Sequence, residues 1–174
     1  ARALRWNQLN CYVGSSAPPT LRSRSPHGIL NVPTSRTPWL TPAVIALLAL
    51  YLAVGYGHAL RLPFLNDDYF FLEKVRQRSF WTLWLPDELI FNWYRPWSRE
   101  FHYWALHQIV GLRESAYHLA SFGLWLASMC AYLLLVNRLA GLAVAAVATA
   151  GLAALGLWSG PLLWIAGAQD LWML

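Results

Sequence analysis

Three long apolar stretches constrain the fold of this chain more than any other feature of its sequence. They cover approximately residues 39–60, 116–136 and 141–158, and none contains Asp, Glu, Lys or Arg. Because a helix needs roughly 20 apolar residues to cross a bilayer, each stretch is long enough to span a membrane. Apolar residues make up 57% of the chain and charged residues only 12%, about half the charged share of a soluble domain. The sequence therefore predicts an all-α integral membrane protein, a multi-spanning helix bundle.

Both ends of the sequence indicate a piece of a larger protein. The chain begins at Ala1 without an initiator Met, and a further apolar stretch begins near Leu171. We therefore expect residues 39–174 to form the N-terminal part of a larger transmembrane domain. Because helices that complete such a domain would be missing, the 174-residue chain is expected to be inactive by itself.

Basic residues predict the orientation of the chain in the membrane. Residues 1–38 contain several Arg but no Asp or Glu, and the short connection at Asn137-Arg138 is also basic. Lys and Arg close to membrane spans tend to remain in the cytoplasm, so residues 61–115 and the segment after Trp158 are predicted to share the outer face. The net charge of +5 is therefore interpreted as a topological signal, and no nucleic-acid partner is expected.

Residues 1–38 are predicted to be a disordered basic tail, because they are rich in Ser, Pro and Arg and show no hydrophobic period. An organelle transit peptide has a similar composition, and that alternative stays open. A cytoplasmic tail is preferred, in a multi-pass protein of a bacterial inner membrane.

The outer-face loop, residues 61–115, contains two polar anchors, Asn66-Asp67-Asp68 and Tyr94-Arg95-Pro96. Asn is a good N-cap and acids suit the first turn of a helix, so the first anchor predicts a helix start. Capping alone would account for one Asp. Consecutive helical positions differ by about 100° in direction, so one carboxylate is expected to face a site while its neighbour caps the helix or meets a basic side chain.

Aromatic and polar residues alternate over residues 79–94, which predicts an interfacial helix on the outer surface. A second helix is predicted from Trp97 to Val110, with an apolar stripe that includes Trp97 and Phe101 and an opposite stripe that holds Glu100, Tyr103 and His107. Glu100 and the His side chains are candidate metal ligands, since two His and a carboxylate suffice for zinc. Since the chain has no HExxH or paired-Cys pattern, interfacial hydrogen bonding is the favoured role for these His.

The order of these motifs resembles the N-terminal part of the GT-C glycosyltransferases, in the branch that contains the O-mannosyltransferases and the aminoarabinose transferases. The matching residues are Asn66-Asp67-Asp68, Tyr94-Arg95-Pro96, His118 and the segment Trp164-Ile165-Ala166-Gly167-Ala168-Gln169-Asp170. The chain differs from many relatives at Ser159-Gly160-Pro161 and at Ala168-Gln169.

The resemblance implies an inverting transfer of a sugar from a polyprenyl-phosphate donor to an acceptor at the outer face. Asp67 or Asp68 would be the catalytic base or would hold a divalent cation, with Asp68 preferred as the base. Tyr94, Arg95, Arg99 and Asp170 would bind substrate, and the Arg residues would stabilise the phosphate leaving group. The partners would be the lipid-linked sugar donor and membrane lipid.

A non-enzymatic membrane protein, such as a transporter or an assembly subunit, is the alternative. In that case the loop would only cap the helix bundle. The second and third apolar stretches contain no Asp, Glu, Lys or Arg, and such intramembrane charges are what mark an ion pathway. This absence counts against a transporter.

Overall fold

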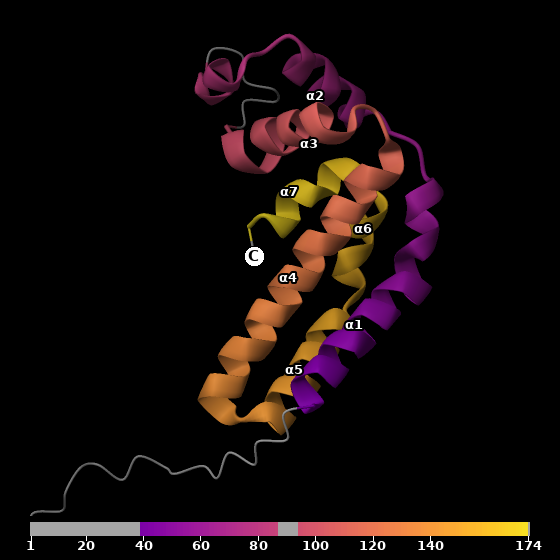
Figure 1. Cartoon of the computed structure of the whole chain (residues 1–174), viewed down its shortest axis with the longest axis vertical. Helices are drawn as coiled ribbons and strands as arrows, with labels where there is room; N and C mark the ends of the chain where they lie inside the picture. Colours follow the sequence, from indigo (N-terminus) through magenta and orange to yellow (C-terminus); the bar gives the residue numbers. More distant parts are fainter. Residues whose placement is uncertain (1–38, 87–93, 174) are drawn as a thin grey trace, which may run out of the picture. The chain divides into compact units, whose positions relative to one another are not determined.

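The computed structural model describes residues 39–86 and 94–173, and every regular element within those ranges is helical (Figure 1). The prediction of a disordered tail over residues 1–38 lies outside the described residues, as does the 87–93 part of the interfacial helix predicted over residues 79–94. In the described part, 79–86, the regular element is a short 3₁₀ turn, Phe80–Trp84, followed by the extended Leu85. The all-helical expectation is confirmed for the described part of the chain.

Among residues 39–86 and 94–173, two single helices are long and apolar enough to cross a membrane. The first is α1, Leu40–Tyr56, which continues through the 3₁₀ turn η1, Gly57–Arg61. The second is α4, Glu114–Ala140, a helix of 27 residues. At 1.5 Å per residue α4 is about 40 Å long, which exceeds the roughly 30 Å of a hydrocarbon core. These helices confirm the first two predicted apolar helices.

The third predicted helix is interrupted. Helix α5 covers Leu142–Ala153 and is followed by η5, Gly156–Trp158, and α6, Ser159–Leu163, with a bend of 54° between the two parts. Leu155 has extended backbone angles at the break, and the Trp158 Nε1 donates a hydrogen bond of 2.7 Å to the Leu152 carbonyl. The indole thus satisfies a carbonyl at the helix end, where intrahelical donors run out. Twelve residues of α5 alone are too short to cross a bilayer.

Helices α4 and α5 form an antiparallel hairpin that turns at Gly141, whose φ of +86° favours glycine (Figure 1). Buried side chains from α1 and α4 form one core around the fully buried Trp125, together with Trp158, Leu162 and Leu171. Large apolar side chains elsewhere on the three long helices are exposed; they include Leu47, Val54, Leu119, Leu135 and Val147. Exposed apolar surface of this extent is typical of a membrane or protein contact.

The loop between α1 and α4 folds into short helices with a core of its own. They are α2, Asp67–Arg76; the 3₁₀ turn η2, Phe80–Trp84; the π-helix η4, Pro96–Phe101; and α3, His102–Val110. Phe71, Tyr103 and Tyr117 are buried together in this second core. The helix start at Asn66 and the helix up to Val110 are both confirmed, although the second begins as a π-helix.

The chain continues after α6 through a C-terminal segment, residues 164–173. This segment contains the 3₁₀ turn η6, Ile165–Gly167, and the short helix α7, Ala168–Leu171. Gly167 allows this segment to pass very close to the preceding turn. A Cβ at Gly167 would lie 2.7 Å from the Cα of Pro161 and 2.9 Å from the carbonyl oxygen of Gly160. Both are backbone atoms, so the clash would require the turn itself to shift.

Gly167→Ala is therefore expected to destabilise the protein by about 1–3 kcal/mol, the usual cost of overpacking a tight contact. Thermal unfolding of the purified protein in detergent would measure this loss. Gly151→Ala is the matched control, because an added Cβ there meets nothing within 4 Å and alanine favours the helix. Equal unfolding temperatures for Gly167→Ala and the wild type would contradict the close packing of this turn.

Candidate functional site

Asp68 lies at the centre of the polar cluster in the loop and is completely buried. Its Oδ1 accepts a hydrogen bond of 2.6 Å from the Tyr103 hydroxyl, and its Oδ2 accepts one of 2.8 Å from the backbone N–H of Leu65. The backbone of Ala166 also interacts with the carboxyl group. Asp68 therefore ties the start of α2 to α3 and to η6.

The start of α2 is held in an unusual way. Asn66 occupies the N-cap position, but its side chain makes no capping hydrogen bond and its backbone has a φ of +31°. That φ lies in a region that a non-glycine residue rarely adopts. The carboxylate of Asp68 reaches back to accept a hydrogen bond from the backbone N–H of Leu65, the residue before Asn66. Asp68 thus contributes to the backbone conformation that places Asp67.

Burial affects the pKa values of Asp68 and its partner Tyr103. It raises the pKa of Asp68, while the hydrogen bonds from Leu65 and Tyr103 act in the opposite direction and lower it. Burial and the neighbouring Asp68 carboxylate both raise the pKa of Tyr103. Tyr103 therefore remains a protonated hydrogen-bond donor throughout the physiological pH range.

Asp67 differs from Asp68 in its surroundings. It is half-buried and makes no hydrogen bond or ion pair within residues 39–86 and 94–173. The two carboxylates thus diverge, as the 100° rotation between consecutive helical positions requires. Asp67 has an oxygen available to a ligand, whereas both oxygens of Asp68 are engaged.

The second polar anchor contacts the C-terminal segment directly. The Nη1 of Arg95 lies 3.7 Å from the Oδ1 of Asp170, and the side chains are 26% and 61% exposed, respectively. The Tyr94 hydroxyl donates a hydrogen bond of 2.6 Å to the Trp84 carbonyl, which connects this anchor to η2. Two residues predicted to bind substrate, Arg95 and Asp170, are therefore adjacent.

Arg99, also predicted to bind substrate, is buried. Its Nε donates a hydrogen bond of 2.8 Å to the Oε1 of Glu100, and its guanidinium lies 5.4 Å from the centre of the Phe71 ring. The Nζ of Lys74 lies 3.5 Å from the same Glu100 oxygen. These ion pairs place Arg99 inside the loop core, away from the surface on which Arg95 lies.

Glu100 and Tyr103, on the stripe predicted to lie opposite the apolar one, are thus on the buried side of the helix formed by η4 and α3. Trp97, on the predicted apolar stripe, is 59% exposed and contacts Trp84. The reason is that α2 supplies buried polar partners, Asp68 for Tyr103 and Lys74 for Glu100. Periodicity within one helix contains no signal for partners on another helix.

His102 forms a second connection between the loop and the C-terminal segment. The Nε1 of Trp172 donates a hydrogen bond of 3.2 Å to the Nδ1 of His102. Burial lowers the pKa of His102 to about 4, so the imidazole is neutral at pH 7. In this neutral form Nδ1 accepts the indole hydrogen, and the buried Nε2 carries the ring proton.

His118, near the head of α4, is also buried. Neither ring nitrogen makes a hydrogen bond of ordinary geometry within the described residues. The backbone of Leu62 and Leu162 and the carboxylate of Asp68 are close enough to interact electrostatically with the ring. His118 therefore packs at the point where η1, α4 and α6 meet.

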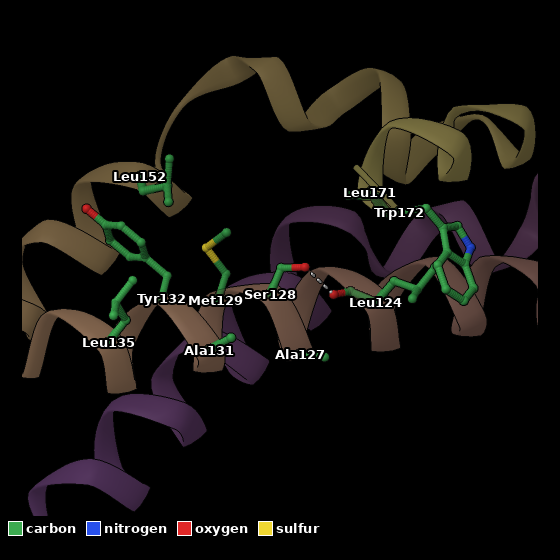
Figure 2. Close-up of a pocket in the computed structure, with 10 residues that line it drawn as sticks. All are labelled: Leu124, Ala127, Ser128, Met129, Ala131, Tyr132, Leu135, Leu152, Leu171 and Trp172. Atoms are coloured by element: carbon green, nitrogen blue, oxygen red, sulfur yellow. Dashed lines mark hydrogen bonds between the residues drawn. The ribbon is translucent and has the colours of Figure 1, made fainter. Parts of the chain in front are cut away.

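An apolar groove of about 480 Å³ runs along α4 (Figure 2). One side of it is formed by α4 residues from Leu124 to Leu135, and Leu152, Leu171 and Trp172 also line it. The Ser128 hydroxyl in this groove donates a hydrogen bond of 3.0 Å to the Leu124 carbonyl, so this polar group is satisfied within its own helix. The lining suits hydrocarbon, and its volume lies in the range of small-molecule sites.

Among the described residues, no three His, Cys, Asp or Glu side chains come close enough together to hold a metal ion. Asp67 and Asp68 point to different surroundings, and Asp170 is paired with Arg95. These donors do not form a protein metal site by themselves.

The sequence predicts that the acidic pair, the Arg95 segment and Asp170 lie on one face. In the structure α2 and α7 each contact both η4 and η6. Sequence reasoning missed the partners that hold them, Tyr103, His102 and Trp172. Comparison of the chain with protein-family models, with curated proteins and with solved structures finds no match.

Proposed function

We propose that this protein is a multi-pass glycosyltransferase of the bacterial inner membrane that transfers a sugar from a polyprenyl-phosphate donor with inversion. The acceptor is at the outer membrane face, where the loop and the C-terminal segment lie. One observation carries the proposal. Arg95 pairs with Asp170, and the next two residues in the chain, Leu171 and Trp172, line the apolar groove along α4. An arginine paired with the segment that lines an apolar groove suits a ligand with a phosphate head and a hydrocarbon tail.

Asp67 is the base in this proposal. Its carboxylate removes the proton of the acceptor hydroxyl while the hydroxyl oxygen forms a bond to the anomeric carbon of the sugar. The bond between that carbon and the phosphate oxygen breaks, and its electron pair stays on the phosphate, which remains attached to the lipid. A single displacement from the opposite face inverts the anomeric configuration.

The surrounding residues have separate roles. Arg95 stabilises the charge that the phosphate gains in the transition state. Asp68 and Tyr103 are positioning residues, because their hydrogen bonds define the start of α2 and hence the place of Asp67. Arg99 and Glu100 support the loop core and do not contact the substrate. The preference for Asp67 over Asp68 follows from the complete burial of Asp68.

A transfer assay tests the proposal. Membranes that contain the full-length protein are incubated with a polyprenyl phosphate that carries a radiolabelled sugar, and loss of label from the lipid is measured. Protein-dependent transfer, together with protection of the loop from protease by the donor, is the expected result. A loop whose proteolysis is indifferent to the donor, in membranes without transfer, would favour a non-enzymatic membrane protein.

A further inference from the structure

We infer that Asp170 is an internal competitor of the phosphate group at Arg95 and sets the affinity of this site for lipid phosphate. The inference rests on the proposed function, since it takes Arg95 as the phosphate-binding residue. It assigns Asp170 a role different from substrate binding. The carboxylate occupies the place of the anion in the free protein and leaves it when the anion arrives.

The geometry of the pair suits such an exchange. The Nη1–Oδ1 distance of 3.7 Å is longer than a charge-assisted hydrogen bond, which is about 2.7–2.9 Å. Asp170 is 61% exposed, so water solvates its carboxylate when the pair separates. Pairs of this kind contribute little stability, and a phosphate offers Arg a bidentate partner with more charge. The phosphate is therefore the stronger partner of the two.

The segment that carries Asp170 is anchored before and after this residue, by contacts that an anion does not displace. Trp172 is held by the neutral His102, and Gly167 packs against the backbone at Gly160 and Pro161. Asp170 lies in the four-residue helix α7 between these anchors. Its side chain can swing away from Arg95 while the backbone keeps its place.

Competition from Asp170 has a consequence for turnover. After transfer, the lipid retains a phosphate monoester, which carries more negative charge than the diester of the donor. This product would bind to Arg95 more strongly than the donor if nothing opposed it. A carboxylate that returns to Arg95 promotes release of the product.

Binding of farnesyl phosphate to the full-length protein in lipid nanodiscs tests the inference. Asp170→Asn is expected to bind farnesyl phosphate about two- to fivefold more tightly than the wild type, the range that corresponds to loss of an exposed ion pair. Arg95→Gln is expected to weaken binding at least about tenfold, the loss of a charge-assisted phosphate contact. Glu73→Gln, the control, removes an exposed ion pair with Arg76 on α2 and should leave the affinity unchanged.

The outcomes separate the inference from the proposed function. Arg95-dependent binding with equal or weaker affinity in Asp170→Asn would overturn the inference alone. If farnesyl phosphate bound to neither the wild type nor Asp170→Asn, the phosphate site of the proposed function would fail, and the inference with it.

Discussion

Replacing Asp67 by Asn is expected to lower the rate of sugar transfer by the full-length protein by about 10²–10⁴-fold, the usual contribution of a general base. Asn has nearly the same shape but cannot take the acceptor proton. Because Asp67 is half-buried and has no hydrogen bond or ion pair within the described ranges, the variant should fold normally. Transfer from a radiolabelled polyprenyl-phosphate sugar measures the rate, and the unfolding temperature verifies the fold.

Asp68→Asn is the matched variant, and it should behave in the opposite way. An Asn side chain has one acceptor oxygen, so either the Tyr103 hydroxyl or the Leu65 amide loses its partner in a buried place. Such a loss costs about 1–3 kcal/mol. We expect a less stable protein whose folded molecules transfer sugar more slowly than the wild type but much faster than Asp67→Asn. Full activity in Asp67→Asn together with an inactive, stably folded Asp68→Asn would reverse the assignment of the base, and two fully active variants would disprove the mechanism.

The sequence predicts the described long helices well because their signal is local. The stretches 39–60 and 116–136 contain no Asp, Glu, Lys or Arg, and a helix satisfies their backbone groups within the segment itself. The start of α2 was also predictable, since Asp67 and Asp68 follow Asn66 at a point where acids suit the helix dipole. The break after Ala153 was not, because residues 141–158 are apolar on both sides of it and contain no proline to signal it.

The sequence predicts several residues of the candidate site but not the residues that hold them in place. Topology placed Arg95 and Asp170 on one face, and the structure brings them to 3.7 Å. The partner of Asp68, by contrast, is Tyr103, which is 35 positions away. No periodicity connects two such residues, and Tyr103 by itself resembles any interfacial tyrosine. Which of two adjacent carboxylates is buried likewise depends on the partner helix, so only the structure distinguishes Asp67 from Asp68.

Acidification is expected to destabilise the protein through His102. The folded-state pKa of about 4 lies below the value of roughly 6.5 for an exposed His. Between these two values the unfolded chain binds a proton that the folded protein does not. The contribution of His102 to stability is therefore complete above about pH 6.5 and is lost as the pH falls toward 4. The pKa difference corresponds to ~3 kcal/mol.

His102→Gln isolates this effect, because Gln keeps an acceptor for the Trp172 indole but does not titrate. Asp68 acts in the opposite direction, since its raised folded-state pKa makes it more stabilising as the pH falls. The measurement is therefore the difference in unfolding temperature between the wild type and His102→Gln, taken at pH 7.5 and again at pH 4.5. The wild type should lose several degrees more than the variant.

Trp172→Phe distinguishes burial from the hydrogen bond as the cause of this pH dependence. Burial alone lowers the pKa of His102, so a variant that keeps an aromatic ring over the imidazole should lose stability on acidification as the wild type does. Its stability at pH 7.5 should fall by about 1 kcal/mol, the usual value of one hydrogen bond.

If His102→Gln and the wild type lose the same stability on acidification, His102 is hydrated in the folded protein. The contact between the loop and the C-terminal segment would then be looser than the hydrogen bond to Trp172 indicates.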